Sequence, residues 1–86
     1  MAWSIQWSDE AIRDLSKLDR PVARRIVVKL EQASQNPFRY FIRLVGGDEC
    51  KLRIGDYRLL AILFPGSQTI LVERVDHRSR VYRRRP

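Results

Sequence analysis

The stretch CKLRIGDYRLLAILF, residues 50–64, decides the fold because it predicts its own pairing. Two strand-like runs flank Gly55-Asp56, a good two-residue hairpin turn, since glycine tolerates the positive φ of its first position. Ile54 is then expected to pair with Tyr57, which places Arg53 opposite Arg58. The stretch therefore predicts two antiparallel strands, residues 50–54 and 57–64.

Alternation of side chains gives this hairpin two different faces. An apolar face, here called the core face, is expected to be covered by helices and carries Cys50, Leu52, Ile54, Tyr57, Leu59, Ala61 and Leu63. The opposite face, here called the cationic face, carries Lys51, Arg53 and Arg58 beside Leu60, Ile62 and Phe64. Like charges directly opposite each other destabilise a sheet by about 0.2–1 kcal/mol. An anion gripped by both guanidinium groups would reverse that sign. Alternatively, the stems lie on apolar surface and the charged heads diverge into water.

A third strand is expected over residues 69–76, after a turn at residues 65–68. If Phe64 pairs with Thr69, alternation adds four residues to the cationic face: Leu71, Glu73, Val75 and His77. In this register His77 lies beside the arginines, with Arg78 and Tyr82 just beyond it. A slip of one residue would move the whole set to the other face.

The N-terminal half predicts one strand and two helices. Residues 3–7 alternate apolar and polar, and Ser8 is a typical N-cap for a helix that extends to about Leu18. Asp19 and Pro21 begin a second helix, which ends at Asn36-Pro37, and residues 37–49 are expected to be irregular or partly extended. The predicted fold class is α+β in one domain, residues 1–86. An N-terminal strand and an antiparallel two-helix hairpin pack on a mainly antiparallel four-stranded sheet.

Composition narrows the classes of function. The net charge of +7 on 86 residues favours polyanionic partners such as nucleic acid or a very acidic protein. One cysteine and one histidine are too few for a disulfide or a structural zinc site, so no metal or cofactor is expected. No apolar run is long enough to span a bilayer, and the start of the chain lacks the pattern of a signal peptide. We therefore expect a cytoplasmic protein without membrane association.

The arginines of the cationic face, together with His77 and Tyr82, suit the cleavage of RNA. The ribose 2′-OH is a nucleophile next to the phosphorus, so an enzyme has only to move protons and to stabilise charge on the phosphate, which preorganised arginines can do. His77, the only histidine, is the expected acid or base. Tyr82 could stack on a base, take part in catalysis or simply pack. Further arginines in and after the last strand are expected to bind RNA: Arg74, Arg80, Arg83 and Arg84.

Two motifs together resemble the RelE/ParE superfamily of toxin–antitoxin toxins. LVGGDECKLRIGDYRLLAILF, residues 44–64, is similar to the family's central hairpin with its basic R-x-G-x-Y-R core. VDHRSRVYRR, residues 75–84, is similar to its C-terminal site segment, in which a histidine or other basic residue, an arginine and a tyrosine occur together. The predicted order of strand, two helices and three-stranded meander also matches, over almost the whole chain.

The resemblance implies a toxin that inhibits translation by cutting mRNA, usually in the ribosomal A site. By position, Lys51 and Arg53 match basic residues of the RNA-cleaving branch, Arg58 matches the transition-state arginine, and Arg78 and Tyr82 match the C-terminal site residues. His77 occupies a position that is histidine in only some members. The spacing from Arg78 to Tyr82 is shorter than in some members.

The resemblance also implies a cognate antitoxin with an acidic tail, in a toxin–antitoxin heterotetramer. Two other functions stay open. One is inhibition of DNA gyrase by the same fold without nuclease activity, as in the ParE branch, which usually lacks the basic constellation. The other is a non-catalytic RNA-binding module, which would need the arginine face but would be indifferent to His77.

Overall fold

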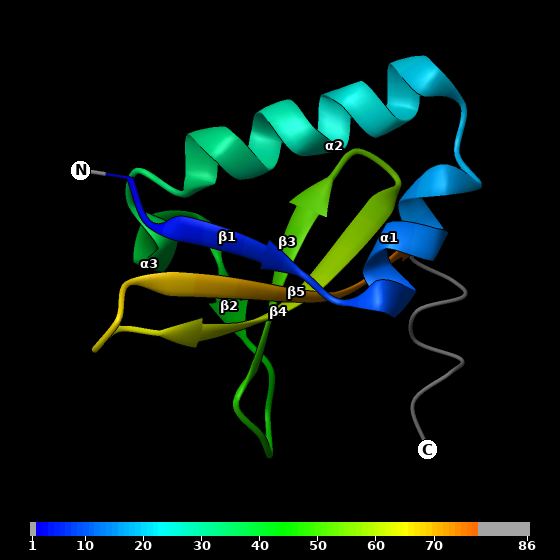
Figure 1. Ribbon diagram of the computed structural model, residues 1–86. Coiled ribbons are helices and arrows are strands. Elements are labelled where there is room, and N and C mark those ends of the chain that lie inside the picture. Colours follow the sequence, from blue (N-terminus) through cyan, green and yellow to red (C-terminus); the bar gives the residue numbers. More distant parts are fainter. Residues whose placement is uncertain (1, 78–86) are drawn as a thin grey trace.

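The structure is a computed structural model that describes residues 2–77 (Figure 1). The predictions made for Arg78, Arg80, Tyr82, Arg83 and Arg84 lie outside the described residues.

One mixed sheet forms the body of the fold, and its strand order is β1-β5-β4-β3-β2. The strands are β1 (Ser4–Trp7), β2 (Ile42–Arg43), β3 (Glu49–Ile54), β4 (Tyr57–Phe64) and β5 (Thr69–His77). β1 runs parallel to β5, and the other pairs are antiparallel. The predicted α+β class is confirmed. The additional strand, β2, has only two residues, too few to leave a periodic pattern in the sequence.

The β3–β4 hairpin has the predicted register. Ile54 pairs with Tyr57 and Arg53 with Arg58, and the turn glycine, Gly55, has a φ of 59°. The core face is also as predicted. The hydrophobic core cluster contains Cys50, Leu52, Ile54, Leu59 and Ala61, and Tyr57 and Leu63 pack against it. The cationic face therefore carries Lys51, Arg53 and Arg58, as the alternation requires.

A β-bulge corrects the predicted faces of β5. Phe64 pairs with Thr69 as expected, but the register shifts between Leu60 and Ala61, which pair with Arg74 and Val72 and leave Glu73 as the extra residue. An extra residue reverses the alternation after it. Val75 is therefore buried in the core, and His77, which pairs with Tyr57, lies on the core face too. Placing Val75 and His77 on the cationic face was wrong.

Three helices accompany the sheet (Figure 1). Helix α1 (Asp9–Ser16) begins at Ser8, whose hydroxyl accepts a hydrogen bond from the Ala11 N–H, as expected of an N-cap. Helix α2 (Arg20–Ala33) begins after Asp19, with proline in its first turn. It crosses the core face, where Ile26, Leu30 and Ala33 are buried. A single-turn helix, α3 (Pro37–Tyr40), occupies part of the segment that was expected to be irregular.

Helix α1 lies along β5 beyond the end of β1. The Ser8 N–H donates to the Val72 carbonyl at 2.9 Å, and its hydroxyl donates to the Glu73 carbonyl at 2.8 Å. These bonds satisfy backbone groups on an edge that β1 no longer covers. The N-terminus of α1 is thus hydrogen-bonded to the bulge in β5.

Candidate anion-binding site

Five cationic side chains line one cavity of about 300 Å³, here called the edge pocket: Lys29, Arg39, Lys51, Arg53 and Arg58. Tyr40, Ile42 and Leu52 complete its described lining, which contains no carboxylate. The pocket lies beside the C-terminal half of β3, because β2 pairs only with Cys50 and Lys51 and leaves the rest of that edge uncovered. Such a concentration of positive charge is complementary to an anion.

Arg58 is the most buried of these cations, with only 6% of its surface exposed. Its NH1 donates to the backbone carbonyls of Tyr57, at 3.1 Å, and Gly55, at 3.4 Å, which holds the guanidinium against the hairpin turn. Its Nε is buried without an acceptor among the described residues. A buried donor without a partner costs free energy that a bound anion would recover. Arg58 is therefore held in place by the hairpin turn, and its buried Nε is left without compensation among the described residues.

Lys51 and Arg53 approach from the same face of the sheet. Arg53 is exposed and lies directly across from Arg58. Lys51 is half-buried and pairs with Ile42 of β2. The three predicted site residues of the hairpin thus line the same cavity. On its other side Arg58 lies directly across from the buried Asp76 of β5, so the cationic face also holds a carboxylate next to Arg58. Asp76 is not part of the described lining of the pocket, where a bound anion would offset the repulsion between Arg53 and Arg58.

Lys29 and Arg39, which the sequence did not single out, line the pocket from α2 and α3. The Lys29 Nζ lies over the Tyr40 ring, 5.2 Å from its centroid, a cation–π contact. Lys29 is only three positions after the buried Ile26 on α2, so it lies near the rim of the apolar stripe. That spacing was the available signal; the position of α3, which supplies Arg39, could not be foreseen from an irregular segment.

His77 does not line the edge pocket. It lies with Tyr57, Asp76 and the turn residues Lys17, Leu18 and Asp19 around a separate hollow of about 260 Å³. Its ring contacts the Tyr57 ring edge-on, with the centroids 5.7 Å apart, and its backbone N–H donates to Asp76 Oδ1 at 2.7 Å. In this geometry the imidazole and the Arg58 guanidinium belong to opposite faces of the sheet.

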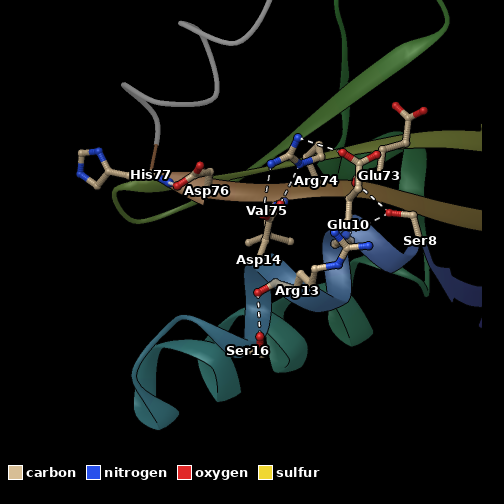
Figure 2. A network of polar contacts seen from close by, with 11 residues as sticks. Ser8, Glu10, Arg13, Asp14, Ser16, Glu73, Arg74, Val75, Asp76 and His77 are labelled. Atoms are coloured by element: carbon tan, nitrogen blue, oxygen red, sulfur yellow. Dashed lines mark hydrogen bonds and ion pairs between the residues drawn. The ribbon is translucent and has the colours of Figure 1, made fainter.

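Arg74, expected to bind RNA, is held by carboxylates of α1 (Figure 2). Its Nε and NH2 donate to the two oxygens of Asp14 at 2.9 and 3.2 Å, and its NH1 lies 3.3 Å from Glu10. The hydrogen bond to Asp14 is the main reason that the pKa of Arg74 is raised. Asp14 also accepts the Val75 N–H at 2.9 Å. The geometry gives Arg74 a structural role, clamping α1 to β5.

Cys50 lies in another hollow, of about 380 Å³, between Phe38, Phe41, Leu63 and the Arg43–Asp48 ion pair. Burial raises the pKa of its thiol, although nearby Arg43 opposes the shift. In residues 2–77 no three His, Cys, Asp or Glu side chains are grouped as metal ligands. No helix in the same part of the chain is long and apolar enough to cross a membrane.

Comparison with known families decides the relationship. A model described as "ParE toxin of type II toxin-antitoxin system, parDE" matches residues 5–82. The chain belongs to this ParE toxin family, within the RelE/ParE superfamily. It is the toxin of a type II toxin–antitoxin system, with a RelE-like fold. No curated protein sequence matches the chain.

Solved toxin structures share the fold. The toxin–antitoxin complex RelBE2 from Mycobacterium tuberculosis matches with a TM-score of 0.78 and 28% identity, over 90% of this chain and 99% of that chain. A mutant of the Escherichia coli toxin RelE in the free state matches with a TM-score of 0.78 and 24% identity, over 96% and 93%. The archaeal RelE–RelB complex from Pyrococcus horikoshii matches with a TM-score of 0.76 and 22% identity, over 93% and 99%. The last two, below 25% identity, bear on the fold alone.

Proposed function

We propose that this toxin is a metal-independent endoribonuclease that cuts mRNA on the ribosome, in the A site, and so inhibits translation. The observation that carries the proposal is the edge pocket, where buried Arg58, whose Nε has no acceptor within residues 2–77, lies among four other cations of that part of the chain. The 2′-OH loses its proton as its oxygen bonds to the adjacent phosphorus, the bond from phosphorus to the 5′-oxygen breaks, and the leaving 5′-oxygen takes up a proton, which yields a 2′,3′-cyclic phosphate and a 5′-OH. In between, extra negative charge develops on the phosphate oxygens. Fixed guanidinium groups stabilise that charge without having to reorganise.

The roles follow from chemistry and position. Arg58 holds the scissile phosphate, with Arg53 as a second fork and Lys51 as a third cation. The guanidinium of arginine stays protonated at neutral pH, so proton transfer falls to Lys51 and to the predicted Tyr82, with Arg78 as a further cation. His77 is dropped as the proton carrier because its ring lies in the hollow on the other face.

The partner is proposed to be a cognate acidic antitoxin, in a toxin–antitoxin heterotetramer in the cytoplasm. The 28%-identical relative was solved as a toxin–antitoxin complex. The charge of +7 suits an acidic partner as well as mRNA. A segment of the antitoxin that covered the edge pocket would block the proposed site.

A second candidate is inhibition of DNA gyrase, which the family match to a ParE toxin favours. A gyrase inhibitor would have no need of a preorganised phosphate site. A third candidate, binding of RNA without cleavage, is favoured by the position of the only histidine outside the edge pocket.

One experiment separates the three. The toxin and its Arg58→Ala variant are induced in cells, mRNA ends are mapped, and the supercoiling of a reporter plasmid is measured in the same cultures. The proposal expects cuts within reading frames, unchanged supercoiling, and loss of both cuts and growth inhibition in Arg58→Ala.

Arg24→Gln is the control, because it removes an exposed charge from α2 outside the pocket. Relaxed plasmid with intact mRNA would establish gyrase as the target. Growth inhibition without cuts or relaxation would favour the binding module. An Arg58→Ala protein that is folded and fully toxic would remove Arg58 from the site.

A further inference from the structure

The edge pocket has a second wall that the proposed reaction does not use. Lys51, Arg53 and Arg58 reach it from the cationic face, whereas Lys29 and Arg39 come from helices on the side of the core face. The two sets therefore meet around the uncovered edge of β3 from opposite sides of the sheet.

Lys29 is held at this wall rather than extended into water. Its side chain is half-buried, and the aromatic ring of Tyr40, itself packed against the core cluster, lies beneath its ammonium group. A cation over a ring keeps most of its donors available, because the ring satisfies charge but accepts no conventional hydrogen bond. Arg39, one residue before that ring, is exposed and lines the same cavity.

The cations of the edge pocket, a cavity of about 300 Å³, are divided between two walls. One tetrahedral phosphate held by the three cations of the cationic face would leave the helix-side wall unoccupied. Five cations without a carboxylate in the described lining call for more than one negative charge.

We infer that Lys29 and Arg39 bind a second phosphate of single-stranded RNA, adjacent to the phosphate that Lys51, Arg53 and Arg58 hold. This inference rests on the proposed function, because it assigns the helix-side wall to the same ligand. The RNA backbone would cross the edge of β3 so that consecutive phosphates meet the two walls in turn. Lys29 and Arg39 then fix the register of the strand and do not take part in the bond-breaking step.

The test uses the shortest RNAs that differ by one phosphate. UpU with 2′-O-methyl sugars contains one phosphodiester, UpUpU contains two, and neither can be cleaved because the nucleophile is blocked. Affinities are measured by NMR titration at 50 and 200 mM salt for the wild type, Lys29→Gln, Arg39→Gln, their double variant and Arg24→Gln. Lys29→Arg serves as the conservative rescue, and thermal melting checks that each variant is folded.

For the wild type, UpUpU should bind more tightly than UpU by roughly fivefold, the effect of a partly exposed charge-assisted contact. A gain of about twofold is statistical, since a trimer offers two phosphates to a single site. The double variant should retain only that statistical gain, and the slope of log affinity against log salt should fall by about 0.7 for each lost phosphate contact. Arg24→Gln and Lys29→Arg should keep the full gain.

An equal gain in the wild type and the double variant would overturn the inference, and so would a wild type that binds neither RNA. Failure of the proposed function gives a different result. If no mRNA is cut in cells while the gain still depends on Lys29 and Arg39, the second phosphate site stands and the nuclease assignment falls.

Discussion

Replacing Asp14 with alanine tests the clamp between α1 and β5. Asp14, only 8% exposed, accepts two hydrogen bonds from Arg74 and one from the Val75 N–H. The substitution removes all three and leaves a buried N–H and a partly buried guanidinium with less compensation. Breaking a buried ion pair by removing one partner costs about 3–5 kcal/mol.

The expected loss is smaller here because the Arg74 side chain is 28% exposed and can hydrate. We expect the free energy of unfolding to fall by about 2–4 kcal/mol. For a domain of this size that lowers the melting temperature by roughly 8–32 °C, at about 4–8 °C for each kcal/mol. Urea unfolding, followed by the fluorescence of Trp3 and Trp7, measures the change.

Glu10→Ala is the matched control on the same helix. Glu10 contacts the same guanidinium, but its side chain is 65% exposed, so its loss should cost no more than about 1 kcal/mol. Equal and small effects of the two substitutions would refute the clamp. The double variant Asp14→Leu/Arg74→Met should be more stable than Asp14→Ala, since only the exposed Glu10 then loses its partner and no buried charge is left uncompensated. If Arg74 instead served RNA, Arg74→Ala would lower the RNA affinity of the folded protein, which the clamp does not expect.

Three further predictions concern single residues. Gly55→Ala should lower the free energy of unfolding by about 1 kcal/mol because its φ is 59°, while Gly66→Ala, in the next turn without a positive φ, should not; equal effects in urea unfolding would exclude backbone strain as the cause. Alkylation of Cys50 by iodoacetamide at pH 8 should be at least about tenfold slower than that of free cysteine, because burial and a raised pKa reduce the accessible thiolate, and it should accelerate as the pH rises; a rate like that of free cysteine would contradict the burial. His77→Gln should keep most of the growth inhibition that Arg58→Ala loses, since the two side chains lie on opposite faces, and equal losses would restore His77 to the site.

The hairpin could be predicted because its information is local. Gly55 fixes the turn, the turn fixes the register, and alternation then places Lys51, Arg53 and Arg58 on one face. The sequence could therefore predict that these three cations share one cavity, and they do line the same cavity. Their role in RNA cleavage stays a proposal.

The faces of β5 were predicted wrongly because strict alternation was assumed across a bulge. The sequence held a signal: Val72 and Val75, both buried, are separated by two polar residues, so they cannot share a face without an extra residue between them. The helix-side wall could not be predicted for a different reason. Lys29 and Arg39 meet only through the packing of α2 against α3, which depends on contacts between segments rather than on a local pattern.

The parallel pairing of β1 with β5 has a consequence for how the toxin is made. The Ser8 hydroxyl and the Glu73 carbonyl that it contacts are 65 positions apart in the chain. The ribosome translates β1 long before β5, the strand that lies between β1 and β4 in the sheet. Non-local pairing of this kind is slow to form. A nascent chain that stops short of β5 would therefore lack the strand that joins β1 to β4, so the sheet that carries the proposed phosphate site would be completed only after Thr69–His77 has been synthesised.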